Sequence, residues 1–95
     1  MHVTIIGKRW RLRFVPNLGG DDKLQTLGDC SGPKDKDKEI RIRQGLDEET
    51  ELDVLIHEML HAAEWTKDES WVKEVATDIA RVLTRLGWRK HHAEK

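Results

Sequence analysis

Three short segments in the first half of the chain alternate between hydrophobic and polar residues. Residues 3–6 are rich in β-branched side chains, and after Gly7-Lys8 hydrophobic residues alternate with arginines over residues 9–14. Alternation with a period of two is typical of a strand with one buried face, so these two segments predict a β-hairpin. Residues 39–43 alternate in the same way, and their outward arginines favour an edge strand, because such charges discourage pairing with another sheet.

The segments between these strands carry weaker patterns. Residues 24–30 alternate briefly and could supply one more short strand. Ser31-Gly32-Pro33 is followed by alternating Lys and Asp over residues 34–38, which offers turn residues but nothing to bury. We therefore expect an exposed, mobile loop between residues 31 and 38.

From Asp47 the hydrophobic period becomes that of a helix. Asp47 is a suitable N-cap, acidic residues occupy the next turn, and we expect the helix to continue to about Trp65. The residues expected on its buried stripe are Leu52, Leu55, Ile56, Met59, Leu60 and Ala63.

A second helix is predicted after the break at residues 66–68. Asp68 can cap it, and Gly87 is well placed to end it. The residues expected on its buried stripe are Trp71, Val72, Val75, Ile79, Val82, Leu83 and Leu86.

Ninety-five residues are enough for one hydrophobic core, so we expect a single domain. Residues 1–46 are predicted to be mainly β, residues 47–87 to form a helical pair, and residues 88–95 to form a frayed tail. The predicted class is α+β, with a short twisted sheet of three to four strands packed on two main antiparallel helices.

The charge balance and the cysteine content restrict which classes of partner and which cellular compartment are expected. Seventeen basic and 18 acidic side chains leave a net charge of −1, so no broad field attracts nucleic acid or an anionic membrane, although arginines alternate along two segments. The single cysteine excludes an internal disulfide, and residues 1–9 show neither the apolar run nor the cleavage site expected of a signal peptide. No apolar stretch in the sequence approaches the length needed to cross a bilayer. These features predict a cytoplasmic protein that binds neither nucleic acid nor membrane. They do not indicate its oligomeric state, and its partner must be inferred from a site.

His57-Glu58-Met59-Leu60-His61 has the H-E-x-x-H pattern and lies inside the first predicted helix. Imidazoles four residues apart project from one helix face and can share a tetrahedral zinc ion. Glu58 lies about 100° further round the helix, where it can act as general base towards a zinc-activated water. Alternatives are two ordinary histidines beside an apolar stripe, or a purely structural zinc site.

A third protein ligand must come from elsewhere in the chain. Glu64 would stack three ligands along one helix face, and Lys67 stands where a metzincin would carry its third histidine. Glu74 is expected to lie level with His61 in an antiparallel helix pair, which makes it the predicted third ligand. Asp78 follows at i+4 and is expected to accept the free ring N–H of a ligand histidine. The alternative for Glu74 and Asp78 is a solvated face beside basic residues.

The motif followed by Glu74 and Asp78 resembles the gluzincin branch of zinc peptidases, and the small size resembles the minigluzincins. Further likeness to small metallopeptidase-like proteins of bacteriophages and prophages lies in residues Trp10–Phe14, Gly28–Cys30, Glu39–Arg43 and Ile56–Ala62. This resemblance implies a zincin-like fold and zinc-dependent peptide hydrolysis, in the bacterial host cytoplasm if the chain is phage-encoded.

Two features bear on whether the chain is catalytically active. The chain has no Tyr to stabilise a tetrahedral oxyanion, and the spacing selects no substitute among Arg41, Arg43, Arg81, Arg85 and the tail histidines. Cys30 is expected to be a small buried hydrophobe, although a thiolate there could block or complete the zinc site. The rival to a peptidase is therefore a catalytically weak or inactive, zinc-stabilised protein that binds a host or phage regulator.

Overall fold

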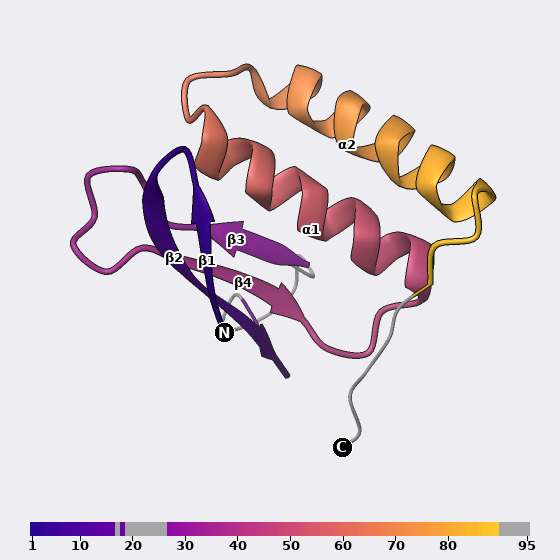
Figure 1. The fold of residues 1–95 in the computed structure, drawn as a ribbon, viewed down its shortest axis with the longest axis horizontal. Helices are drawn as coiled ribbons and strands as arrows, with labels where there is room; N and C mark the ends of the chain where they lie inside the picture. Colours follow the sequence, from indigo (N-terminus) through magenta and orange to yellow (C-terminus); the bar gives the residue numbers. More distant parts are fainter. Residues whose placement is uncertain (17, 19–26, 90–95) are drawn as a thin grey trace.

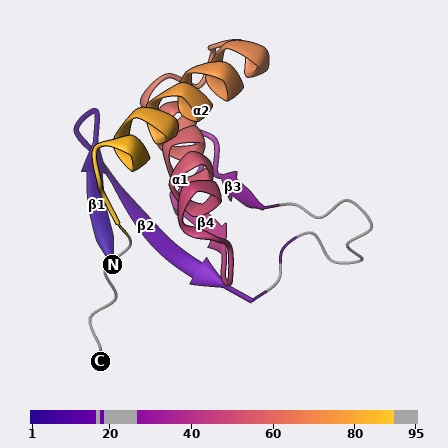
Figure 2. The same ribbon diagram turned by 90° about the vertical axis from the view of Figure 1, so that its right-hand side faces the viewer.

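The protein is a four-stranded sheet with one helix on its face and a second helix stacked on the first. The computed structural model describes residues 1–16, 18 and 27–89 (Figure 1). Helix α1 spans Glu48–Ala63 and helix α2 spans Glu69–Arg85. Helix α1 contacts β1, β3 and β4, whereas α2 contacts α1 alone among the described elements (Figure 2). The α+β class is confirmed, but only one of the two helices packs on the sheet.

The predicted hairpin is present. Strands β1, His2–Ile5, and β2, Lys8–Val15, pair antiparallel with Ile5 opposite Lys8. The two turn residues, Ile6 and Gly7, have φ values of 50° and 69°. Positive φ at both positions matches the right-handed twist of a hairpin, but a β-branched residue adopts it only with strain.

The prediction of an edge strand at residues 39–43 is wrong. Strand β4, Glu39–Arg43, lies between β2 and β3, Gly28–Cys30, in the order β1-β2-β4-β3. It is parallel to β2 and antiparallel to β3. The outward Arg41 does not block pairing, because it forms an ion pair with Asp29 on β3. The open edge on this side belongs to β3, the short predicted strand; its first predicted residues, 24–26, lie outside the described residues.

The core between the sheet and α1 is built from the alternating residues of β2 and β4. Trp10, Ile40 and Ile42 are fully buried, and Ala62 of α1 packs against them. A chain of this size has room for one such core. The sheet and α1 thus form the rigid base on which the functional residues of α1 are held.

Both helices begin and end near the predicted residues. The Asp47 side chain accepts a hydrogen bond from the backbone N–H of Thr50, whereas Asp68 caps α2 without a side-chain bond to the backbone. Gly87 has a φ of 94°, as a residue after a helix end requires.

Within the loop predicted at residues 31–38, Lys34 and the next three residues are exposed, as predicted. No helix in the described part of the chain is long and apolar enough to cross a membrane.

The buried stripe of α2 differs from the predicted one. Val72, Ala76 and Ala80 are fully buried against α1, while Val82 and Leu86 are 55% and 71% exposed. Small alanines bring the two helices close together, so the contact uses the face with the smaller side chains. The true stripe is turned from the predicted one, and this rotation changes which acidic residue of α2 can reach the histidines.

Candidate metal centre

His57 and His61 converge on one point beside the sheet. They lie one turn apart on α1, their side chains are only 18% and 17% exposed, and their Nε2 atoms are 3.2 Å apart. The helical spacing of the H-E-x-x-H motif predicts this convergence, because i and i+4 side chains share a face. The sequence-based pairing of the two histidines agrees with the structure.

Glu69 completes a group of three. Its Oε1 lies 2.9 Å from Nε2 of His61, and its Oε2 lies 3.1 Å from Nε2 of His57. Glu69 is the first residue of α2 and precedes the buried Val72 by three positions, so it shares the face that packs on α1. Among the described residues, these three are the group that could hold a metal ion.

The spacing of these three residues suits zinc. Ligand atoms on a tetrahedral zinc, at about 2.0–2.1 Å from the ion, lie roughly 3.3 Å from one another. Here the two Nε2 atoms are 3.2 Å apart, and each lies 2.9 or 3.1 Å from a different carboxylate oxygen of Glu69. With one ligand atom from each residue, the three atoms lie within 4.8 Å of one another. Two imidazoles and one carboxylate are also a donor set of catalytic zinc sites, which keep the fourth position open. The donor types and their approximate spacing therefore fit the ion.

Glu58 faces the sheet side of the same pocket. It is 7% exposed, and burial, reinforced by the negative charges of Asp29 and Glu69, raises the pKa of its carboxyl to about 7. The pocket has a volume of about 520 Å³ and is bordered by residues of β3, α1 and the start of α2. A buried carboxyl with a pKa near neutrality is the property expected of a general base.

His57 is set up as a neutral ligand. Burial lowers the pKa of its imidazole, although the nearby carboxylate of Glu69 partly opposes this effect. A neutral imidazole keeps a lone pair for a metal ion, whereas a protonated one repels it. The burial of α1 against the sheet thus favours the binding form of this histidine.

Strand β3 forms the wall opposite the histidines. Gly28 touches α1 so closely that an added Cβ would lie 2.6 Å from Cγ1 of Val54 and 3.2 Å from Cγ of Glu58. Cys30 is half-buried, its thiol donates to the carbonyl of Ser31 over 3.4 Å, and burial raises its pKa to about 12. A protonated, packed thiol agrees with the small hydrophobic role predicted for Cys30.

Glu74 and Asp78 do not join the histidines. Both are exposed, and Asp78 instead contacts Arg81 over 3.4 Å. Glu74 lies two positions after the buried Val72, about 200° round the helix, so it points away from α1. Both the predicted level and the predicted rotation of α2 were wrong, because His61 lies against Glu69, five residues before Glu74. Glu69 lies three residues before Val72, on the side of α2 that carries the buried small residues.

None of the described residues at the pocket can be assigned as a donor to a tetrahedral oxyanion. Arg41 makes two hydrogen bonds to Asp29, and none of the described residues that border the pocket is Arg, Lys or Tyr. Trp65 does border it, with its ring centroid 6.1 Å from that of His61, whereas Trp71 is exposed beneath the Lys67 ammonium. Trp65 rather than Trp71 therefore borders the pocket.

Comparisons with protein-family models, with curated proteins and with solved structures find no match to this chain.

Proposed function

We propose that the chain is a zinc-dependent metallopeptidase whose ion is held by His57, His61 and Glu69. The observation that carries the proposal is the convergence of these three side chains at 2.9 to 3.2 Å, next to the buried Glu58. Zinc bound there supplies a Lewis acid that polarises the scissile carbonyl and lowers the pKa of water. Glu69 replaces Glu74 as the proposed third ligand.

Glu58 is the proposed general base. Its carboxylate accepts a proton from the attacking water and then delivers it to the leaving amine, which lets the peptide bond break without expelling an amide anion. Burial raises its pKa to about 7 in the zinc-free chain, and a bound zinc ion nearby would lower this value and keep the carboxylate available as a base. Its burial also fixes the carboxylate in one place.

Strand β3 is the proposed binding edge for an extended peptide. The backbone of Leu27 and Ser31 bonds to β4, so the alternation of an antiparallel strand turns the backbone groups of Gly28 and Cys30 to the edge left open by the described strands. A substrate that pairs there by β-addition would pass beside Glu58 and the histidines. Because main-chain groups dominate such binding, unstructured peptides of varied sequence are the expected substrates.

The test is cleavage of a denatured or unstructured protein by the zinc-loaded chain and by Glu58→Gln. We expect the variant to retain stoichiometric zinc and to lose at least about 1,000-fold in turnover, within the range for loss of a general base. Equal turnover by the variant would exclude this mechanism. The neutral amide has the shape of the carboxyl, so the fold is not at risk.

The second candidate is a zinc-stabilised binding protein without peptidase activity. It is favoured by the lack of an evident oxyanion donor among the described residues of the pocket and by the small core, to which a metal would add stability. A chain that unfolds in chelator and cleaves no unstructured peptide would support this candidate. A folded apo form whose cleavage activity returns with zinc would exclude it.

A further inference from the structure

The face of the sheet turned away from α1 is rich in arginine. Arg9 and Arg11 flank the fully buried Trp10 on β2, so their side chains point to the face opposite the core. The same alternation places three more arginines on this face, from β2 and β4: Arg13, Arg41 and Arg43. Helix α1 packs on the side of Trp10, and α2 contacts α1 alone among the described elements, so no described helix covers the arginines.

Near the beginning of β2 and β4, this face is hollowed into a basic pocket of about 660 Å³. Because β2 and β4 are parallel, the hairpin turn before β2 and the loop before β4 lie at the same end of the sheet (Figure 1). The backbone N–H of Arg11 donates to the carbonyl of Lys38 over 2.9 Å, which joins the loop to the strand. The positively charged side chains that line the basic pocket come from both segments: Arg9, Arg11, Lys36 and Lys38.

Positive charge exceeds negative charge in the basic pocket. Its two carboxylates belong to Asp37 and Glu39, and Glu39 already pairs with Arg13 at 2.9 Å. The four cationic side chains of the pocket and Arg13 therefore face only these two carboxylates. The guanidinium groups of Arg9 and Arg11 make no hydrogen bond or ion pair with the described residues, so they are available to a ligand.

His2 also lines the basic pocket and reports its electrostatic potential. It lies opposite Arg11 in the pairing of β1 with β2. The positive charge of Arg9 is the main cause that lowers the pKa of His2, and desolvation, the amino group of Met1 and Arg11 lower it further. An anion bound in the pocket would act in the opposite direction and raise this pKa. The imidazole of His2 is therefore a natural probe of anion binding.

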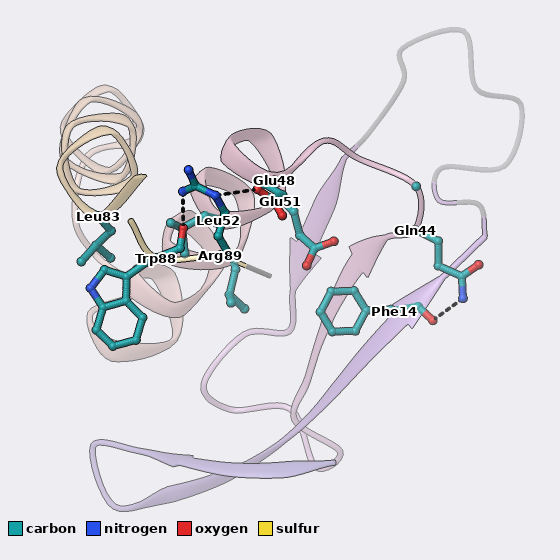
Figure 3. Close-up of a pocket in the computed structure, with 10 residues that line it drawn as sticks. Phe14, Gln44, Glu48, Glu51, Leu52, Leu83, Trp88 and Arg89 are labelled. Atoms are coloured by element: carbon teal, nitrogen blue, oxygen red, sulfur yellow. Dashed lines mark hydrogen bonds and ion pairs between the residues drawn. The ribbon is translucent and has the colours of Figure 1, made fainter. Parts of the chain in front are cut away.

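A pocket on the other side of the molecule shows what the basic pocket lacks. Phe14, Leu52 and Trp88 line that other pocket, and its Arg89 lies 3.5 Å from the carboxylate of Glu48 (Figure 3). By contrast, none of the described residues that line the basic pocket is apolar, apart from the methylene stems of the long side chains. The basic pocket therefore offers no surface on which a ring or hydrocarbon chain could pack, and charge and hydrogen bonds must hold its ligand.

We propose that the basic pocket binds a chain of phosphates, as carried by inorganic triphosphate or by a nucleoside triphosphate. The guanidinium fork matches two oxygens of a phosphate, and the lysines add point charges. Arg9 and Arg11 are two residues apart on one strand, about 6.8 Å, so they can hold different phosphates of one chain. Several negative charges close together match the excess of cations better than one phosphate or carboxylate does. This inference does not depend on zinc or on the proposed peptidase activity.

The test is an NMR titration of the full chain with inorganic triphosphate, followed on the ring signals of His2 at about 50 mM salt. We expect a dissociation constant below about 1 mM and a higher pKa for His2 in the complex. Adenosine triphosphate should bind within about threefold of inorganic triphosphate, because no described residue of the pocket holds the base. A short thymidine oligonucleotide should bind at least about tenfold more weakly, since its charges are spread along the strand.

Matched arginine variants locate the site. Arg9→Gln and Arg11→Gln should each weaken triphosphate binding about tenfold, because each removes a charged donor. Arg43→Gln removes the same charge from the same face of the sheet, outside the pocket, and should leave the affinity within about twofold. Before any ligand is added, Arg9→Gln should also raise the pKa of His2, because it removes the main cause of the lowered value.

Each titration is run on the metal-free chain and on the zinc-loaded chain, and circular dichroism checks the helix content of every variant. With zinc present, the ring signals of His57 and His61 report separately any binding of phosphate to the ion. No response of His2 at about 5 mM triphosphate would overturn the proposal. Equal weakening by all three variants, a response confined to His57 and His61, or tighter binding of the oligonucleotide than of triphosphate would also overturn it.

Discussion

The two helices contribute to one metal centre in different ways. Helix α1 supplies His57, Glu58 and His61 from five consecutive residues, so helical spacing alone fixes their relative positions. Helix α2 supplies Glu69, whose position depends on how the second helix is rotated against the first. Residues of a motif within one helix have fixed relative positions. The position of a ligand from another element depends on how the two elements pack together.

The packing of α2 is decided by small residues. Ala76 and Ala80 are fully buried against α1, while the larger Val82 and Leu86 stay exposed. If α2 were turned so that its larger side chains faced α1, Glu69 would leave the histidines. The rotation of this helix is therefore the link between the fold and the proposed site.

The largest expected effect is on zinc affinity, and it distinguishes Glu69 from Glu74 as the third ligand. Glu69→Gln should weaken zinc binding at least about 100-fold, because a neutral amide replaces one of three protein ligands. Glu74→Gln removes the same charge from the same helix at an exposed position and should leave the affinity within about twofold. Competition with a chromophoric chelator measures both, and the reverse ranking of the two variants would contradict the site.

The next largest effect is a pH dependence in the zinc-free protein. The pKa of Glu58 is raised from 4.5 to about 7 in the folded chain, so folding binds a proton between these values. Stability from this group is fully present below pH 4.5 and is lost as the pH rises to about 7. Relative to Glu58→Gln, the wild type should lose about 2–3 kcal/mol of unfolding free energy over this range.

Urea denaturation of both proteins in chelator, at pH 4.5, 6 and 7.5, measures this difference. His57 titrates in both proteins, and its lowered pKa acts in the opposite direction, so only the comparison isolates Glu58. A constant difference between the two proteins across the range would show that Glu58 is not held in a buried environment.

A smaller effect is expected at the contact between β3 and α1. Gly28→Ala places a methyl group 2.6 Å from Cγ1 of Val54, so the strand must move away from the helix. We expect a loss of about 1–2 kcal/mol in stability, as for other overpacked sites, together with a higher KM for unstructured substrates. Gly32→Ala is the control in the neighbouring loop, since its nearest contact would be an ordinary 3.7 Å.

The smallest effect concerns the hairpin turn between β1 and β2. Ile6 has a φ of 50°, and Asn adopts this conformation more readily than a β-branched residue. Ile6→Asn should therefore raise the unfolding free energy by about 0.5–1 kcal/mol without changing zinc affinity. A thermal melt measures it, and a lower melting temperature would show that the exposed Ile6 side chain contributes more than the strain costs.

Much of the fold could be predicted from local patterns. Period-two alternation gave the hairpin of β1 and β2, and the change of period at Asp47 gave α1 with its N-cap. Strand β3 has three residues and no clear alternation, so its pairing on β4 could not be foreseen, and residues 39–43 were taken for an edge. Pairing partners depend on contacts between segments far apart in the sequence.

The site was predictable to the extent that it is local. The convergence of His57 and His61 follows from the helix, whereas Glu69 required the rotation of α2. The hydrophobic pattern of α2 pointed to the wrong face, because several of its largest apolar side chains are exposed while small alanines pack on α1. When apolar residues lie on two sides of a helix, the sequence does not say which side faces the rest of the chain.

The most direct test of the metal centre is a crystal of the zinc-loaded chain measured on both sides of the zinc absorption edge. We expect one anomalous peak, about 2.0–2.2 Å from Nε2 of His57, Nε2 of His61 and a carboxylate oxygen of Glu69. A peak bound by Glu74, or a peak elsewhere with the two imidazoles turned apart, would contradict it.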